Sequence, residues 1–121
     1  MKDYRNILDN IKRYVSLTEA DEREFISIVK TSRIKRRQFI VQPGFVCHEQ
    51  TYVYKGAFRS YFVTDAGLEH TIQFAIEDWF ISDFNSYINQ EPASLFVEAL
   101  EDSIIQQITC LLYTSPSPRD A

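Results

Sequence analysis

The strongest constraint on the fold lies in residues 55–103, where short stretches of alternating polar and apolar side chains follow one another closely. The chain contains three glycines, Gly44, Gly56 and Gly67, and each lies between two such stretches. Glycine adopts the positive φ angles that tight turns require. Many short strands joined by tight turns are typical of a jelly roll or barrel. We therefore predict a mainly β fold with flanking helices.

The period of the side-chain pattern changes to two from residue 32 onward, which indicates strands. We expect strands at residues 33–37, 39–42, 46–49, 51–54, 57–64, 68–75, 95–101 and 104–108. Successive residues of a strand point to opposite faces of a sheet. In the 68–75 strand we therefore expect His70, Ile72 and Phe74 to share one face.

Two helices are expected before the strands. Residues 2–15 place apolar side chains at helical spacing, which gives one apolar stripe. A second helix is expected to begin at Thr18 and to end near residue 30 or 31. Thr18 and Asp21 have the spacing of a capping box, in which each side chain accepts from the other residue's backbone N–H. We predict a helical hairpin over residues 1–31 and a β-roll over residues 32–109.

A short polar helix is expected to interrupt the strands between residues 80 and 91. Ser82 or Asp83 can cap this helix, which would end at about Ile88, and Pro92 then fixes the exit of the chain. Free N–H groups at the start of a helix attract anions. We therefore predict that a phosphate or carboxylate group binds at the start of this helix.

The composition limits the chain to one domain and excludes several function classes. With 121 residues, 45% of them hydrophobic, the chain can bury a single modest core. A net charge of −4 provides no basic field for nucleic acid. We find no apolar run long enough to cross a membrane and no signal peptide, and we expect a cytoplasmic protein without a membrane partner. No catalytic motif stands out, so we expect neither enzyme activity nor a cofactor.

The last residues do not continue the pattern of the domain. Residues 110–120, CLLYTSPSPRD, end in a run of serine and proline without core-facing periodicity. They also match, in order, the translation of a common transposon-end sequencing adapter. We therefore predict that residues 110–121 are a non-native tail and that the native sequence continues differently after Thr109. Cys110 then belongs to the tail, which leaves Cys47 as the one native cysteine of this fragment.

The chain resembles the Crp/Fnr family of bacterial transcription regulators, in particular members common in Bacteroidetes-type bacteria. The resemblance rests on QPG near the first turns, on the YKG step, and on HTIQFAIEDWFISD followed by EPASLFVEALEDS. It implies a double-stranded β-helix, or jelly roll, of the cyclic-nucleotide-binding-domain type that senses an effector. In complete members a dimerisation helix and a DNA-binding winged helix-turn-helix follow. We therefore expect a truncated regulator that is a homodimer when complete and contacts DNA only through the missing C-terminal domain.

The nucleotide-binding members of this family carry Gly-Glu-Leu and, about ten residues later, Arg-Ser or Arg-Thr. Ser82, Asp83 and Phe84 stand at the first motif of this chain, and Ala93 and Ser94 stand at the second. The family's arginine supplies paired donors for the cyclic phosphate, and Ala93 supplies none. We predict that cAMP and cGMP do not bind tightly. The resemblance implies that a small anionic or nucleotide-like effector contacts Ser82, Asp83, Phe84, Asn85 and Ser94.

Two alternatives stay open at this point. The roll could be an effector-independent scaffold whose interior is filled by its own side chains. It could also be a cupin-type metal-binding protein. However, the pairs His48/Glu49 and His70/Glu69 lack the His-x-His spacing of such sites, and we expect no metal ligands. The basic residues between positions 30 and 37 are expected to form a solvated strand edge.

Overall fold

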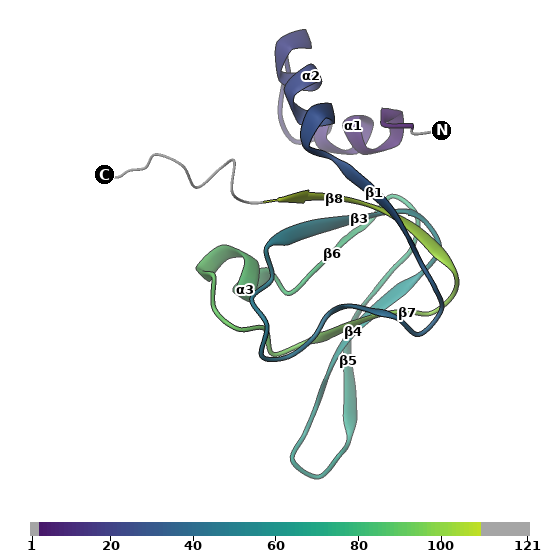
Figure 1. Cartoon of the computed structure of the whole chain (residues 1–121), viewed down its shortest axis with the longest axis vertical. Helices are drawn as coiled ribbons and strands as arrows, with labels where there is room; N and C mark the ends of the chain where they lie inside the picture. Colours follow the sequence, from purple (N-terminus) through teal and green to yellow (C-terminus); the bar gives the residue numbers. More distant parts are fainter. Residues whose placement is uncertain (1–2, 110–121) are drawn as a thin grey trace.

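The computed structural model describes residues 3–109, which form two four-stranded antiparallel sheets and three short helices (Figure 1). The first sheet has the order β1-β8-β3-β6. Its strands are β1 (Lys30–Ile34), β8 (Ser103–Thr109), β3 (Glu49–Lys55) and β6 (Phe80–Ile81). The second sheet has the order β2-β7-β4-β5, with β2 (Phe39–Val41), β7 (Phe96–Ala99), β4 (Phe58–Val63) and β5 (Glu69–Ala75). Because strands distant in sequence pair with one another in both sheets, the predicted jelly-roll architecture is confirmed.

The main core lies between the two sheets. Its members are apolar side chains from both sheets and from the connecting loops, all less than a tenth exposed: Val41, Cys47, Val53, Phe58, Ala75, Ile81, Ala93, Val97, Ala99 and Ile105. Removing apolar surface from water is the main favourable contribution to folding. The inner faces of the strands are therefore fixed by their apolar residues.

The N-terminal helices α1 (Arg5–Lys12) and α2 (Glu19–Ile28) lie on the outer side of the first sheet, with α1 next to the sheet and α2 extending away from it (Figure 1). Ile7, Leu8, Phe25 and Val29 pack there against Tyr52 of β3 in a second apolar cluster. The predicted capping box is confirmed. Asp21 N donates to Thr18 Oγ1 over 3.1 Å, and Thr18 N donates to Asp21 Oδ2 over 3.0 Å.

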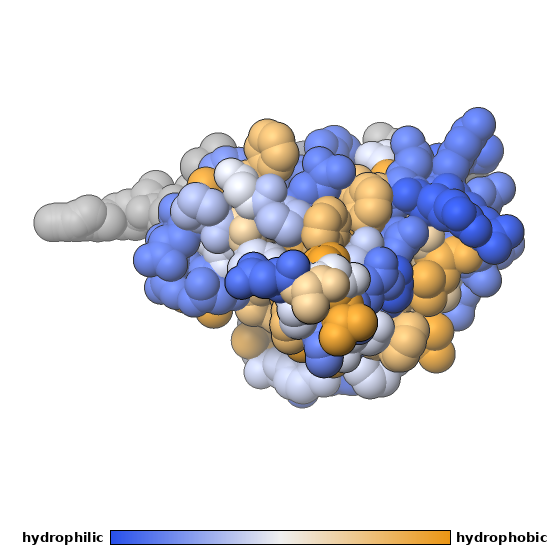
Figure 2. Space-filling model, turned by 90° about the horizontal axis from the view of Figure 1, so that it is seen from below, coloured by the Kyte–Doolittle hydropathy of each residue, from blue (hydrophilic) through white to orange (hydrophobic). Residues whose placement is uncertain are grey.

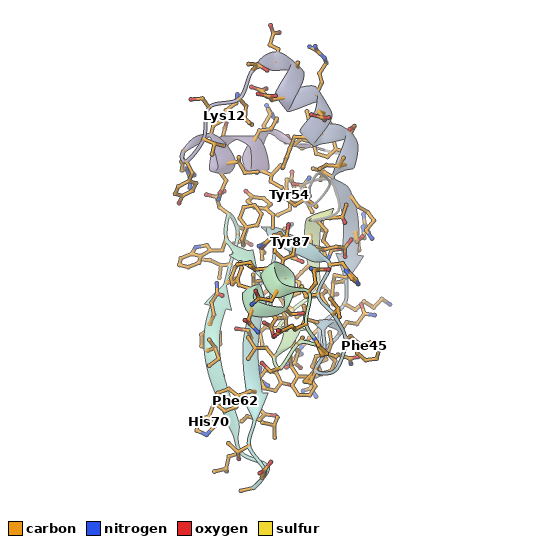
Figure 3. All side chains as sticks on the ribbon, turned by 90° about the vertical axis from the view of Figure 1, so that its left-hand side faces the viewer. Lys12, Phe45, Tyr54, Phe62, His70 and Tyr87 are labelled. Carbon is orange, nitrogen blue, oxygen red and sulfur yellow. The ribbon has the colours of Figure 1, made fainter. Side chains whose placement is uncertain are left out.

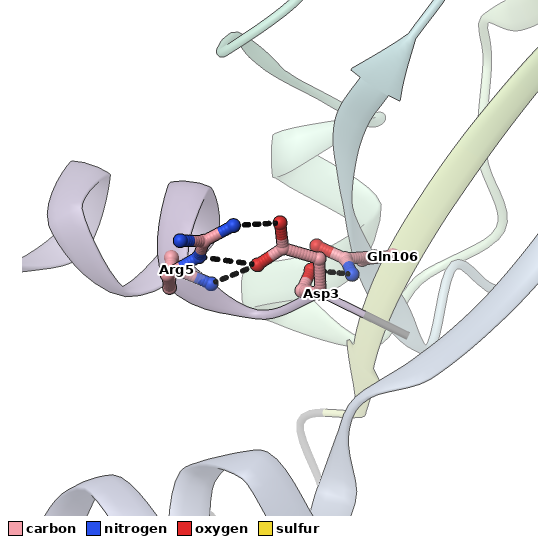
Figure 4. A network of polar contacts seen from close by, with 3 residues as sticks. All are labelled: Asp3, Arg5 and Gln106. Atoms are coloured by element: carbon pink, nitrogen blue, oxygen red, sulfur yellow. Dashed lines mark hydrogen bonds and ion pairs between the residues drawn. The ribbon is translucent and has the colours of Figure 1, made fainter. Parts of the chain in front are cut away.

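Asp3 ties the start of the chain to the last strand (Figure 4). The buried side chain of Gln106 on β8 donates from Nε2 to the carbonyl oxygen of Asp3 over 2.8 Å. The carboxylate of Asp3 in turn forms an ion pair with Arg5, with Nη2 and Oδ2 3.0 Å apart. The predicted tail at positions 110–121 and its cysteine lie outside the described residues.

Two strand predictions were wrong in part, and one short strand was missed. Residues 46–48 form a loop with one isolated bridge between Val46 and Pro92, and β3 begins only at Glu49. The two-residue strand β6 was missed because such a short element has no measurable period. β1 begins at Lys30 and ends at Ile34, whereas Arg37, predicted to be in this strand, has a φ of 72°. A positive φ is incompatible with a regular strand.

The predicted shared face of His70, Ile72 and Phe74 was also wrong, because β5 contains an irregularity. His70 pairs with Phe62 and Phe74 pairs with Arg59, and the register between β4 and β5 shifts by one residue between these pairs. Phe62 and Arg59 are three residues apart and lie on opposite faces of β4. A bulge therefore places His70 and Phe74 on opposite faces of β5.

The β4–β5 hairpin extends beyond the rest of the roll (Figure 1). It carries exposed apolar side chains. Leu68, Ile72 and Phe74 are each more than half exposed. Figure 2 shows the molecule from below the view of Figure 1, and several apolar residues lie among polar ones on this face. None of the helices within residues 3–109 is long and apolar enough to span a membrane.

Candidate functional site

The predicted short helix is present as α3 (Phe84–Asn89), between β6 and β7. Of the two predicted caps, Ser82 and Asp83, the N-cap of the helix is Asp83. Its Oδ1 accepts from Ser86 N over 3.1 Å. A carboxylate at the N-terminus of a helix compensates the free N–H groups and the helix dipole. The C-cap of α3 is Gln90, which adopts the left-handed conformation with a φ of 54°.

The second carboxylate oxygen of Asp83 binds the other end of the same loop. Asp83 Oδ2 accepts from Ser94 N over 2.9 Å and from Leu95 N over 3.2 Å. The residue is only 3% exposed. One buried carboxylate therefore holds together the start of α3 and the segment that enters β7.

Ser86 is a second tie, which the sequence pattern did not indicate. Its side chain is fully buried, accepts from Cys47 N over 2.7 Å and donates from Oγ to the carbonyl oxygen of Glu91. It thus connects α3 both to the 42–48 loop and to its own exit segment. Its place three residues after the cap predicts only the contact of its backbone N–H with Asp83 and not these side-chain contacts.

The other predicted contact residues divide into a buried and an exposed group. Ser82 is buried, and its hydroxyl donates to Gln50 Oε1 over 3.3 Å. Phe84, Asn85 and Ser94 are exposed. The structure thus brings Ser82, Asp83 and Ser94 together at the base of the loop and leaves the side chains of Phe84 and Asn85 on its outer surface.

Ala93 is part of the main core, with 5% of its surface exposed. Its backbone pairs with the opposite loop: Ala93 N donates to Phe45 O over 2.8 Å and Gly44 N donates to Ala93 O over 2.9 Å. The position at which the resemblance leads one to expect an arginine in nucleotide-binding members is therefore occupied by a small apolar side chain inside the roll. It offers no donor for a phosphate.

The histidines lie apart from one another. His48 Nδ1 is 3.2 Å from Gln90 Oε1, next to α3. His70 stacks on Phe62, with ring centroids 5.1 Å apart, near the tip of the hairpin (Figure 3). Within residues 3–109 no three His, Cys, Asp or Glu side chains are grouped as metal ligands would be.

The loop that Ser86 holds also borders a cavity of about 270 Å³. Its lining includes apolar residues of β2 and of the 42–48 loop, together with Glu49, Thr51 and Gln107. Cys47 lies in this wall, and burial raises the pKa of its thiol. A thiol that stays protonated is a poor nucleophile and metal ligand, so Cys47 behaves as a core residue.

The basic residues of the β1–β2 turn border a wider groove on the outer face of the second sheet. Arg59 lies there between two carboxylates, 3.0 Å from Glu69 and 3.1 Å from Glu98, with its guanidinium 3.9 Å from the centre of the Tyr61 ring. The two glutamates offset the charge of Arg59, and Arg36 and Arg37 of the turn carry the remaining positive charge of the groove.

No family model matches the chain, and no curated protein matches it in sequence. Solved structures do match its fold. The sensor domain of the transcriptional regulator DNR from Pseudomonas aeruginosa superposes with a TM-score of 0.76 at 12% identity, covering 88% of this chain and 70% of that one. The chain has the fold of a cyclic-nucleotide-binding domain.

Two further neighbours show how widely this fold is used. The Catabolite Activator Protein of Thermus thermophilus has a TM-score of 0.71 at 16% identity, over 84% of this chain and 47% of that one. The regulatory subunit of a cAMP-independent protein kinase A from Trypanosoma brucei has a TM-score of 0.74 at 13% identity, over 88% of this chain and 39% of that one. The chain thus spans less than half of each of these two proteins. All three neighbours are regulatory or sensor proteins, and at these identities the likeness establishes the fold alone.

Proposed function

We propose that this chain is the effector-sensing domain of a Crp/Fnr-type transcription regulator. The fold it shares with the DNR sensor domain and with the Catabolite Activator Protein supports this proposal. The observation that carries it is the loop between β6 and β7. Asp83 and Ser86 hold the base of this loop, whereas Phe84, Asn85 and Ser94 remain exposed for contact. A small molecule that binds there can shift the loop between two arrangements and so change the state of the regulator.

The effector is not expected to be cAMP or cGMP at high affinity. A cyclic phosphate needs a charged donor when it is taken out of water. Ala93 lies where the family pattern has this donor, and it is packed into the core. The same fold also occurs in a kinase subunit that is called cAMP-independent, which is consistent with a roll that does not depend on cAMP.

The rest of the regulator would follow this fragment. We infer a dimerisation helix and a DNA-binding helix-turn-helix after Thr109, a homodimer as the complete form, and a cytoplasmic location. The exposed apolar side chains of Leu68, Ile72 and Phe74 on the β4–β5 hairpin are available for contact with such an element. Sequencing the native gene downstream of codon 109 tests this directly. A stop codon or an unrelated domain at that point would overturn the proposal.

Ligand binding is tested on the purified chain by thermal unfolding with cAMP, cGMP, anionic metabolites and neutral metabolites. Ligand that binds only the folded state raises Tm in a saturable way. We expect no shift with cAMP or cGMP and a saturable shift with at least one other compound. The variant Asn85→Ala tests the location of the site. This exposed substitution on α3 should weaken the ligand-induced rise in Tm without changing Tm in the absence of ligand. A wild-type Tm raised by micromolar cAMP would refute the prediction for cyclic nucleotides.

The main alternative is an effector-independent scaffold. The continuous apolar core between the sheets favours it, because the chain's own side chains fill that space. The two functions are separated by the same screen carried out on the complete native protein. If no compound raises the Tm of the complete protein and none changes its affinity for DNA, the scaffold is favoured.

A further inference from the structure

Two buried oxygen atoms on the outer face of the first sheet have no hydrogen-bond partner within residues 3–109. They are Oε1 of Gln106 on β8 and Oγ1 of Thr31 on β1. The two residues are directly opposite each other in the sheet, so their side chains lie side by side on one face. Nearly all buried polar groups of folded proteins have a partner in the protein, in ordered water or in a ligand. The pair therefore points to a bound molecule.

The amide group of Gln106 has a fixed orientation. Its Nε2 donates to the carbonyl oxygen of Asp3 over 2.8 Å (Figure 4). A carbonyl oxygen only accepts, so the amide nitrogen must face Asp3, and Oε1 is left to accept from another group. Gln106 is 1% exposed, and leaving a buried acceptor of this kind unpaired is costly. The bound molecule must therefore carry a hydrogen-bond donor.

Both residues line a cavity of about 220 Å³ between the N-terminal segment and strands β1, β3 and β8. Arg33 of β1 and Tyr54 of β3 line the same cavity and bring donors to it. Within the described part of the chain, the guanidinium of Arg33 and the hydroxyl of Tyr54 form no hydrogen bond or ion pair. The carboxylate of Asp3, which also borders the cavity, is paired with Arg5 at 3.0 Å. The cavity thus presents unpaired acceptors together with unpaired donors.

We propose that this cavity binds a small neutral molecule through a carboxamide group. The N–H groups of the carboxamide donate to Gln106 Oε1 and Thr31 Oγ1, and its carbonyl oxygen accepts from Arg33 or Tyr54. A carboxylate of the same size has no N–H group and would leave the buried acceptor of Gln106 unpaired. An ammonium group would meet the positive charge of Arg33. The carboxamide is the group that pairs both sets of atoms.

The site is separate from the loop between β6 and β7. Asp3 leads into α1, and its carbonyl oxygen is already bound to Gln106 of β8. A molecule in the cavity adds a second connection between the N-terminal segment and the first sheet. The inference does not rest on the proposed function, so the two can fail independently.

The test uses acetamide as the probe, titrated into the whole chain and followed in ¹H–¹⁵N spectra. We expect saturable shifts of the Gln106 side-chain amide and of the backbone amides of Thr31 and Gln106. Acetate, added at constant ionic strength, is the matched probe, because it has the size of acetamide and no N–H group. Acetate should shift none of these resonances saturably, although the charge of Arg33 favours it.

The variant Thr31→Val removes the hydroxyl and keeps the shape of the side chain. It should raise the apparent dissociation constant for acetamide about fivefold or more, because one hydrogen bond is lost. Its Tm without acetamide should be unchanged or higher, since a buried oxygen without a partner is replaced by a methyl group. The matched control is Thr71→Val on β5, an exposed substitution away from the cavity that should leave the dissociation constant unchanged.

Four results would overturn the proposal. If only water occupies the cavity, acetamide shifts none of the three resonances saturably. Equal shifts with acetate would show that the charge of Arg33, and not the buried oxygens, selects the ligand. Unchanged acetamide binding in Thr31→Val would remove this residue from the site. A lower Tm of Thr31→Val without acetamide would show that the hydroxyl has a partner within the fold.

Discussion

Asp78 connects the N-terminal helices to the roll, and its bond with Tyr52 should contribute measurably to stability. Tyr52 is 1% exposed, and its hydroxyl donates to Asp78 Oδ1 over 2.6 Å. Asn10 of α1 donates from Nδ2 to the carbonyl oxygen of Asp78 over 2.7 Å, and Arg13 pairs with Oδ2 over 2.8 Å. Asp78 has a φ of 75°, so its backbone is held in a region that favours glycine. The nearby side chain of Tyr54 also lies between the helices and the roll (Figure 3), and it provides a control variant.

The magnitude follows from the burial of the two partners. A hydrogen bond to a charged group contributes about 1.5–3 kcal/mol. The Asp78 side chain is 38% exposed, and screening by solvent places the bond at the lower end. We expect Tyr52→Phe to lower the free energy of unfolding by about 1.5 kcal/mol. Asp78→Gly should cost more, about 2.5 kcal/mol, because it leaves a buried hydroxyl without an acceptor.

Urea unfolding of wild type, both single variants and the double variant measures the coupling. Glycine replaces Asp78 because it adopts the positive φ without strain. We expect a coupling free energy of about 1.5 kcal/mol. The matched control is Tyr54→Phe on the same face of β3, for which no hydroxyl hydrogen bond is seen among residues 3–109, so its change should stay within about 0.5 kcal/mol.

The coupling should also depend on pH. Burial raises the pKa of Asp78, but the hydrogen bonds from Tyr52, Arg13 and Asn10 outweigh it, and the net pKa lies below the ordinary value of 3.8. A carboxyl group whose pKa is lowered by folding stabilises the protein above its ordinary pKa. That stabilisation is lost as the pH falls through the lower folded value. A coupling below about 0.5 kcal/mol at neutral pH, or one that does not fall as the pH is lowered below the ordinary pKa, would refute this reasoning.

Two further predictions concern a turn and a cap. Gly56, in the turn between β3 and β4, has a φ of 112°, and a Cβ there would lie 2.9 Å from the Cα of Ser103. Gly56→Ala should therefore lower the free energy of unfolding in urea by about 3 kcal/mol or more. A loss below about 1 kcal/mol would contradict the close approach of this turn to β8. Thr18→Ala removes the capping box of α2 and should lower the free energy of unfolding by about 1 kcal/mol. The exposed substitution Ser16→Ala should have little effect, and equal losses in the two variants would contradict the capping role.

The fold was largely predictable because its signals are local. The alternation of side chains, the glycines between strands and the capping pair of Thr18 and Asp21 depend on near neighbours in sequence. The failures arose where distant segments decide the outcome. The bulge in β5 reverses the faces of His70 and Phe74, and it appears only when the register with β4 is known. β6 exists because its two residues pair with Thr51 and Tyr52, which lie far earlier in the chain.

The candidate site was predictable in its location but not in its connections. The cap at Asp83 follows from residue type and position. Its bonds to Ser94 N and Leu95 N cross the whole loop, and no sequence pattern marks a backbone N–H as a partner. Ser86 was overlooked for the same reason, because its partners are the backbone groups of Cys47 and Glu91.

Ala93 and Asp83 together explain why a shared architecture does not prescribe the ligand. A charged side chain at position 93 would be buried and would need a partner of opposite charge, which a bound phosphate supplies. Alanine removes that requirement, and the position joins the apolar core. Asp83 then supplies the anion that the backbone N–H groups of the loop still require. The two residues therefore act in the same direction: Ala93 removes the need for an external anion inside the roll, and Asp83 accepts from the N–H groups of the loop.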